Sequence, residues 1–298
     1  MGTKLRRSLA NAAIFCFVML AATTSLSAQS DFTGKYRKLN HWDAVKRGAG
    51  PEIGDYTGLP LNDAARMRAD SWEASLFTIP EYQCRPHTGV YSERGFSGTI
   101  LKWWAEVDPK TQKIVAWRTR GGFGEPQRWI YMDGRPHPPE YAAHTWLGFS
   151  TGTWEGNKLV VRTTHLKEGY IERNGVAQSD RAVETEDWIR HGDYLNDIQT
   201  VEDPVYLSEP LVRSSAWILD ESLEFSRSPC APQEITVEVV RTATQIPHIL
   251  PGKNKGLAEF PTRFGLPYEA VRGRAEAMYP EYLEKLKTMK PATKESAP

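Results

Sequence analysis

Short runs of alternating apolar and polar residues, separated by turn residues, fill the middle of the chain. The clearest case spans residues 147–165, where Gly156 and Asn157 separate two such runs. A two-residue turn of this composition is typical of an antiparallel hairpin. It predicts four facing pairs: Trp154 with Leu159, Gly152 with Val161, Ser150 with Thr163 and Gly148 with His165. Since side chains alternate along a strand, Ser150 and His165 are predicted to share the apolar, inward face.

The same pattern of alternating runs and turn residues predicts more strands on both sides of this hairpin. Asp108 and Pro109 suit a type I turn between two β-prone runs, and His191-Gly192-Asp193 separates another two. The predicted strands lie at about 100–107, 113–119, 128–132, 183–190, 194–201, 212–219, 223–226 and 235–239. Consecutive hairpins without helices between them indicate antiparallel pairing, and nine or ten strands indicate a mainly β fold, either a closed barrel or a sandwich.

The segments that flank the predicted barrel have a different character. Residues 29–97 are expected to form an N-terminal arm with a short helix near Trp42 and a helix capped by Asn62. Residues 98–245 are expected to form the barrel. Residues 246–298 form a C-terminal extension in which Pro267 opens a helix, Pro280 interrupts it, and an apolar stripe follows at Tyr282, Leu283, Leu286 and Met289. This stripe predicts a helical pair packed on one end of the barrel.

The first 28 residues have the organisation of a secretory signal peptide. Lys4, Arg6 and Arg7 precede an apolar run at 12–22, and small residues follow as far as Ala28. The run is too short to span a bilayer comfortably, so no stable membrane anchor is expected. The paired arginines also fit a twin-arginine leader. A periplasmic or secreted location follows from either reading.

Charge and cysteine content restrict the partners and the compartment. Removal of residues 1–28 takes away three positive charges, which leaves 34 basic against 37 acidic residues and a net charge of −3. Nucleic acid is therefore not an expected partner, because phosphate binding needs a clustered positive field. Cys84 and Cys230 remain, and export favours a disulfide between them. Two buried free thiols are the alternative.

A G-x-S-x-G pattern at residues 148–152 suggests a nucleophilic serine. In serine hydrolases this motif lies between a strand and a helix. Here a second strand follows, so the nucleophile-elbow interpretation fails. The remaining possibility is that Ser150 and His165 meet as nucleophile and base on the inward face.

Histidines and a proline-rich loop provide the other candidate groups. His87, His137, His144, His165 and His191 lack the spacing of metal ligands, so the sequence predicts no metal and no cofactor. The loop at 133–140 contains one Gly and three Pro, which favours a rigid recognition loop near the barrel mouth. A plain connector is the alternative. Trp146, Trp154 and Trp188 are candidates to line a pocket, or they are core residues.

Several motifs together resemble a large family of exported bacterial proteins of unassigned function. They are DGRPHPPE, GFSTGTWEGNKLVVRTTHL, RNGVAQSD, EDPVYLSEPLV, PHILPGKN and AMYPEYLEKL, and they cover most of the mature chain. The resemblance implies a secreted β-rich domain and no activity. By architecture alone, the predicted barrel is also similar to the calycin or lipocalin class.

These patterns lead to two principal hypotheses about function. In the first, the barrel binds a small apolar or aromatic molecule, with His137, His144, Trp146, Trp154 and Trp188 as ligand-binding residues. In the second, the protein is a lyase, isomerase or hydrolase acting on such a molecule, with His165 as acid/base, Arg135 or Tyr141 stabilising charge, and Ser150 as a possible nucleophile. A structural envelope protein with a filled core is a third class.

Overall fold

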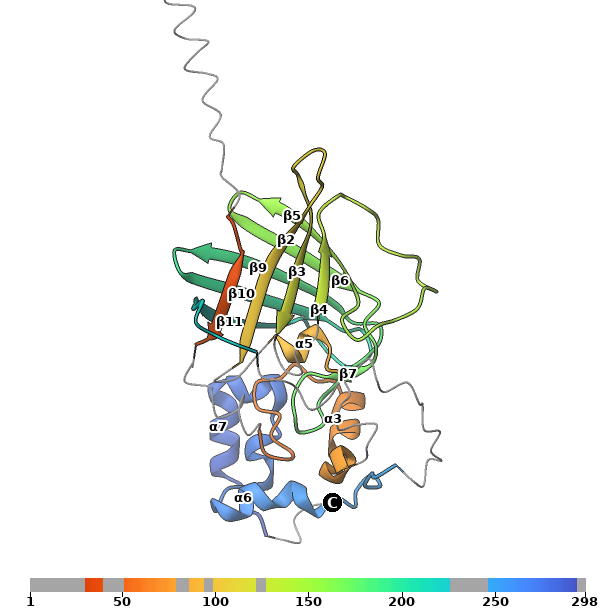
Figure 1. Cartoon of the computed structure of the whole chain (residues 1–298). Helices are drawn as coiled ribbons and strands as arrows, with labels where there is room; N and C mark the ends of the chain where they lie inside the picture. The colour runs from red at the N-terminus through yellow and green to blue at the C-terminus, as the bar shows by residue number, and fades with distance from the viewer. Residues whose placement is uncertain are drawn as a thin grey trace, which may run out of the picture.

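Nine strands form a closed barrel (Figure 1) in the computed structural model, which describes residues 30–39, 51–78, 86–93, 99–121, 127–225 and 246–293. Around the barrel the order is β1-β11-β10-β9-β6-β5-β4-β3-β2. The strands are β1 (Gly34–Lys38), β2 (Ile100–Val107), β3 (Ile114–Gly121), β4 (Gln127–Tyr131), β5 (Phe149–Glu155), β6 (Lys158–Thr164), β9 (Val183–His191), β10 (Tyr194–Glu202) and β11 (Leu211–Leu219). A separate two-stranded sheet joins β7 (Gly169–Tyr170) and β8 (Ala177–Gln178).

The predicted mainly β barrel is confirmed, and so is most of the predicted hairpin register. β5 and β6 pair Trp154 with Leu159, Gly152 with Val161, and Ser150 with Thr163. The pairing ends one residue before the fourth predicted pair, at Phe149 and Thr164. The barrel is not wholly antiparallel, because β4 and β5 run parallel and residues 132–148 cross over between them.

Two strand predictions were wrong in detail. β1 was not expected, because five residues are too few to show a period, yet it closes the barrel between β2 and β11. Residues 223–225 form no strand. The predicted strand at 235–239, the helix near Trp42, the leader, Cys84 and Cys230 lie outside the described residues.

Inward-facing residues divide the barrel interior into layers. One end is an apolar cluster that includes Phe32, Trp103, Trp117, Trp188 and Trp217. A second apolar cluster, which includes Ala65 of α3 and Val90 of α5, lies beyond the other end. On β10 the inward positions run from Leu195 in the first cluster through Asp197 and Gln199 to Val201 in the second. A polar layer therefore lies between the two apolar clusters.

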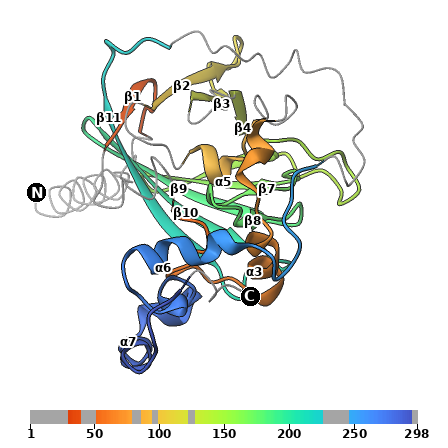
Figure 2. The same cartoon turned by 90° about the horizontal axis from the view of Figure 1, so that it is seen from below.

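Helices cover one end of the barrel (Figure 1). They include α3 (Asp63–Asp70), α5 (Gly89–Ser92), α6 (Glu259–Arg263) and α7 (Pro280–Lys287). Figure 2 shows α5 within the ring of strands, with α6 and α7 further out. Asn62 caps α3 as predicted, by accepting a 3.0 Å hydrogen bond from the Ala65 amide. Pro280 occupies the first turn of α7, so it opens this helix and does not interrupt one.

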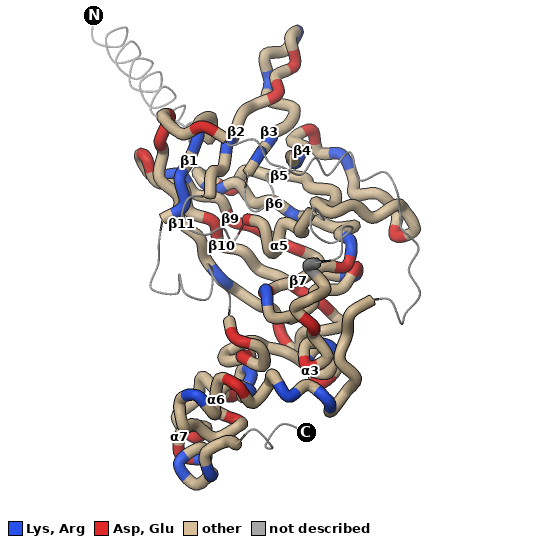
Figure 3. Tube along the Cα trace, turned by 60° about the horizontal axis from the view of Figure 1, so that its bottom comes forward, with Lys and Arg blue, Asp and Glu red and all other residues tan. Residues whose placement is uncertain are grey.

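Charged residues of both signs lie along the helices at this end of the barrel. Figure 3 shows Lys and Arg interspersed with Asp and Glu along α6 and α7. Tyr282 is the buried residue of α7, whereas Leu283 is exposed. Within the described ranges, no helix is long and apolar enough to cross a membrane.

Candidate functional site

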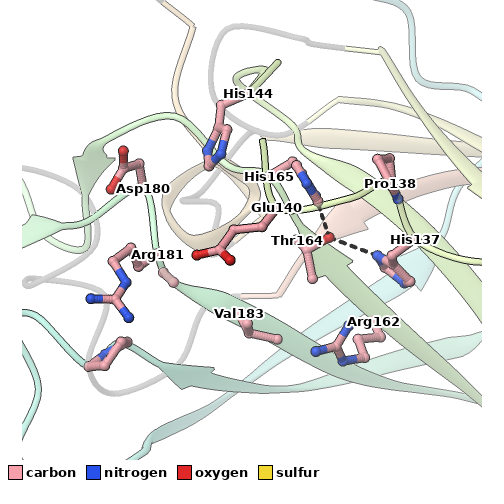
Figure 4. Close-up of a pocket in the computed structure, with 12 residues that line it drawn as sticks. His137, Pro138, Glu140, His144, Arg162, Thr164, His165, Asp180, Arg181 and Val183 are labelled. Atoms are coloured by element: carbon pink, nitrogen blue, oxygen red, sulfur yellow. Dashed lines mark hydrogen bonds between the residues drawn. The ribbon is translucent and has the colours of Figure 1, made fainter. Parts of the chain in front are cut away.

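A pocket of about 550 Å³ lies on the outer face of the barrel, where the crossover loop 132–148 passes over β6 and the segment that leads into β9 (Figure 4). It gathers three of the predicted histidines with charged and apolar residues from four segments. The lining residues are His137, Pro138, Glu140, His144, Arg162, Thr164, His165, Asp180, Arg181, Ala182, Val183 and Pro204. The volume lies in the range of small-molecule binding sites.

Two threonines on the outer face fasten the crossover loop to the barrel. His137 Nδ1 lies 2.7 Å from Thr164 Oγ1, and its Nε2 lies 2.8 Å from Thr151 Oγ1. Both threonines face outward because Ser150 and Thr163, their neighbours in the chain, face inward and are buried. The loop is therefore held over the outer face of β5 and β6 by a residue predicted to bind ligand.

His165 also belongs to the outer pocket, which corrects its predicted inward orientation. Its φ of 58° turns the chain out of the strand, so the alternation ends at Thr164. The imidazole Nδ1 lies 2.8 Å from Thr164 Oγ1, and Nε2 lies 3.0 Å from the Pro139 carbonyl oxygen. His165 thus joins β6 to the crossover loop and does not meet Ser150.

The hydrogen-bond pattern assigns a proton position to each neutral imidazole of the pocket. A carbonyl oxygen can only accept, so His165 Nε2 donates to Pro139 and its Nδ1 accepts from the Thr164 hydroxyl. Thr164 Oγ1 then accepts from His137 Nδ1, and His137 Nε2 accepts from Thr151. Burial, helped by the positive charge of Arg162, lowers the pKa of His137, which favours this neutral form.

His144 is the histidine with a lone pair left for a ligand. Its Nδ1 lies 2.8 Å from the Leu166 carbonyl oxygen and must donate to it. Its Nε2 therefore carries the lone pair, and no described residue donates to that atom. The His144 and His165 rings are close, with centroids 5.2 Å apart. Of the three histidines, His144 is the one that can accept a proton from a bound molecule.

Four charged side chains complete the pocket. Arg162 and Arg181 lie on either side of Val183, and Glu140 and Asp180 lie across from them (Figure 4). None of the four forms an ion pair with another described residue. The pocket therefore offers separate cationic and anionic groups together with an imidazole acceptor.

Three other predicted site residues, Arg135, Tyr141 and Trp146, do not line this pocket. Arg135 pairs with Asp133, with Nη2 2.5 Å from Oδ2, and stacks on Tyr131 with its guanidinium carbon 3.8 Å from the ring centroid. The Tyr141 side chain is 90% exposed. Trp146 lies under the Lys167 ammonium, which is 5.0 Å from the ring centroid.

The remaining predicted residues are inside the barrel. Trp188 is fully buried, and Trp154 packs on Phe32 with ring centroids 5.4 Å apart. Ser150 lies in the polar layer, where its Oγ accepts a 2.9 Å hydrogen bond from Arg128 Nε and lies 2.9 Å from Thr163 Oγ1. No histidine contacts it among the described residues. The predicted serine–histidine pair is therefore not formed.

Arg128 is the centre of the buried polar layer, and all five of its N–H donors are used. Nε donates to Ser150, Nη1 donates to Glu93 and Glu186, and Nη2 donates to Thr163 and Glu186. The Arg128 side chain is 2% exposed. A guanidinium with every donor satisfied binds protein groups and has none left for a ligand.

The carboxyl groups of this layer differ in the direction in which their pKa values are shifted. Burial pushes the pKa of Glu186 up, but Arg128 and the hydrogen bonds of Glu186 outweigh burial and hold this pKa below its usual value. Burial and the negative charge of Glu186 raise the pKa of Glu184 to about 8. Burial, again with the repulsion of Glu186, raises the pKa of Glu93 and of Asp197 well above the ordinary range.

Sequence reasoning missed most of these groups, although strand periodicity contained a signal. Glu184 and Glu186 alternate with Trp188 along β9, and Arg128 alternates with Ile130 along β4. Charged residues in phase with core residues indicate a buried polar network. Arg162 and Arg181 carried no comparable signal, because the pocket exists only after the crossover loop has folded over β6.

The comparisons with known proteins add little to this geometry. No protein-family model matches the sequence, and no curated protein matches it. The structure is similar to the crystal structure of secretory abundant heat soluble protein 4 from Ramazzottius varieornatus, with a TM-score of 0.29 and 13% sequence identity. That match covers 63% of this chain and 94% of the other chain.

Proposed function

We propose that this is an exported protein that binds a small molecule in the outer pocket, and that the ligand is an aromatic or apolar acid bearing a hydroxyl or amino group. The observation that carries this proposal is the set of unpaired groups around one 550 Å³ space: Arg162, Arg181 and the Nε2 atom of His144. The leader, with its predicted cleavage near residue 28, supports a periplasmic or secreted location.

Each part of the proposed ligand corresponds to one part of the pocket. A guanidinium without a partner is suited to a carboxylate, with which it forms charge-assisted hydrogen bonds. The His144 lone pair accepts a hydrogen bond from a hydroxyl or amino group. Pro138, Ala182, Val183 and Pro204 supply apolar surface for the body of the molecule.

The ligand is assigned to the outer pocket because the aromatic residues of the barrel interior contact one another. Trp103 packs against Trp117 and Trp188, with ring centroids 6.2 and 4.9 Å apart, and against Phe32 at 5.3 Å. In the described part of the barrel these rings fill space that an interior ligand would need. The outer pocket, in contrast, has an opening to solvent and unpaired polar groups.

Calorimetric titration with three related probes tests this assignment. We expect 4-hydroxybenzoate to bind more tightly than benzoate, which lacks the donor for His144, and than phenol, which lacks the carboxylate. Loss of one good polar contact costs about 1.4 kcal/mol, which is a tenfold increase in Kd. His144→Gln should abolish the preference for 4-hydroxybenzoate over benzoate, and Arg162→Gln or Arg181→Gln should abolish the preference over phenol.

Arg135→Gln is the matched control, because Arg135 belongs to the same loop but does not line the pocket. If the pocket variants bind all three probes as wild type does, the assignment of the pocket is wrong. If no member of a wider panel of small acids binds to the wild-type protein, the ligand class is wrong.

An acid–base enzyme is the second candidate, and the free lone pair of His144 favours it. The Nε2 lone pair of His144 can remove a proton from a bound hydroxyl or from carbon next to a carboxylate. This hypothesis replaces His165 by His144 as the base. It predicts chemical conversion of the bound acid by wild type and none by His144→Gln, which mass spectrometry of the recovered ligand would detect.

A further inference from the structure

Three acidic side chains meet inside the barrel, away from the outer pocket. Glu93 follows α5, Glu186 belongs to β9, and Asp197 belongs to β10. One carboxylate oxygen from each lies within 4.8 Å of the other two. The three residues are 4%, 0% and 1% exposed. Barrel closure and the position of α5 within the ring (Figure 2) bring these distant parts of the sequence together.

Asp197 faces this group without a hydrogen bond of its own, and Lys38 and Arg128 act on it through their charges. Its side chain forms no hydrogen bond or ion pair with any described residue, and the Oε2 atom of Glu93 also accepts no hydrogen bond from them. Arg128 cannot donate a hydrogen bond to Asp197, because its five N–H donors already bind other groups. Buried carboxyl oxygens nearly always have a partner in native proteins. A buried carboxyl that has no hydrogen bond and faces two other carboxyls therefore points to a bound group.

We propose that Glu93, Glu186 and Asp197 form a binding site for a hard divalent cation, with calcium as the ion that fits best. Carboxylate oxygens are the ligands that calcium, magnesium and manganese prefer. Three oxygens separated by up to 4.8 Å surround a point no more than about 2.8 Å from each. Calcium–oxygen distances of about 2.3–2.6 Å need only a small contraction, whereas magnesium needs a larger one.

Charge balance in the polar layer supports this site. Three ionised carboxylates beside Arg128 leave two negative charges in a buried space, which is costly. A divalent cation supplies two positive charges that offset it. Lys38 and Arg213 add positive charge nearby, and Glu184 adds negative charge only when it is ionised, so these groups offset part of the two negative charges.

The proposed site uses oxygen ligands alone and is separate from the histidines. The histidine spacing still predicts that no transition metal binds there. The site is independent of the proposed outer pocket as well, so titration of the pocket in the presence of a chelator distinguishes failure of one proposal from failure of the other.

Calorimetric titration of calcium into chelator-treated, full-length protein tests the proposal. We expect one calcium ion per chain and a higher melting temperature when calcium is added. Asp197→Asn should reduce the affinity at least tenfold. Since Asp197 has no hydrogen-bond partner to lose, this variant should remain folded, which circular dichroism and the melting temperature of the metal-free protein verify. Magnesium and manganese are tested in parallel.

Glu184→Gln is the matched control, because Glu184 lies in the same layer but outside the trio. It should bind calcium within about threefold of wild type. The proposal is overturned if none of the three cations binds to wild type, or if Asp197→Asn binds as wild type does. Equal loss in both variants would refute this choice of ligands.

Discussion

The outer pocket and the buried polar layer are built from the same kinds of side chain, but their surroundings give them opposite properties. In the pocket, Arg162 and Arg181 are exposed and have no ion-pair partner. In the layer, Arg128 is buried and saturated, and the neighbouring carboxyls have strongly shifted pKa values. Unpaired charge is tolerated in the pocket because water solvates it, whereas in the layer each charge needs a protein partner, a proton or a cation. The pocket can therefore exchange a ligand, while the layer fixes the structure.

The largest expected effect that separates the two regions is on stability. Arg128→Met should lower the free energy of unfolding by about 3–5 kcal/mol, because the buried Glu186 carboxylate would lose the Arg128 guanidinium that pairs with it. Arg162→Met in the pocket should change it by less than about 0.5 kcal/mol. Urea denaturation at neutral pH measures both. The double variant Arg128→Met with Glu186→Gln should recover part of the loss, because the buried charge is then gone. A loss below about 1 kcal/mol in Arg128→Met would contradict the central role of this residue.

The second effect is a pH dependence that originates in the layer. Glu184 has a pKa of about 8 in the folded protein and an ordinary pKa of 4.5 when unfolded. Between these values the folded state binds the extra proton, so stability should fall as pH rises from about 4.5 to about 8 and should level off above. In metal-free protein the fall should amount to several kcal/mol. Glu184→Gln should flatten this part of the profile of unfolding free energy against pH. An unchanged profile would show that Glu184 is ionised in the folded state.

The sequence predicted the parts of the fold that depend on local pattern and turn chemistry. Gly156-Asn157 set the register of β5 and β6, Asp108 and Pro109 placed the β2–β3 turn, and Asn62 capped α3. The parallel pairing of β4 with β5 could not be predicted in this way, because it depends on a seventeen-residue crossover between two strands. The closure of the barrel by β1 depends likewise on long-range contacts.

The candidate site was predicted only in part, for related reasons. His137, His144 and His165 were selected by residue type and do meet in one pocket. The predicted inward orientation of His165 was wrong, because a positive φ at this one residue turns its side chain to the outer face and nothing in the local alternation shows it. Arg162 lies on the exposed face of β6, where the alternation alone gives it no special role. It becomes part of a pocket only because His137 fastens the crossover loop over that face.

A third, smaller effect tests the orientation of His165. Both His165→Ala and His165→Gly remove the bonds to Thr164 and Pro139, but only Gly adopts a φ of 58° without strain. The Gly variant should therefore be more stable than the Ala variant by about 1 kcal/mol. In a regular strand with an inward His165 the order would be reversed, because Gly weakens strands. Thermal and urea unfolding of the two variants therefore shows which of them is more stable. In both variants the pocket should bind its probe more weakly, because the crossover loop loses one of its attachments.

The smallest expected effect concerns Arg135, which the sequence nominated for charge stabilisation. Its guanidinium donates hydrogen bonds to Asp133, and these bonds lower the pKa of the Asp133 carboxyl. The guanidinium also stacks on Tyr131 on the outside of the barrel. Arg135→Gln should therefore leave the Kd for 4-hydroxybenzoate within about twofold of wild type, because exposed ion pairs contribute little. Titration beside Arg181→Gln gives the contrast, since the latter removes a cation that lines the pocket. A tenfold weaker affinity for Arg135→Gln would mean that the loop closes further over the ligand and brings Arg135 with it. In that case the recognition site would extend from His144 to the tip of the crossover loop, and the predicted role of Arg135 would be restored.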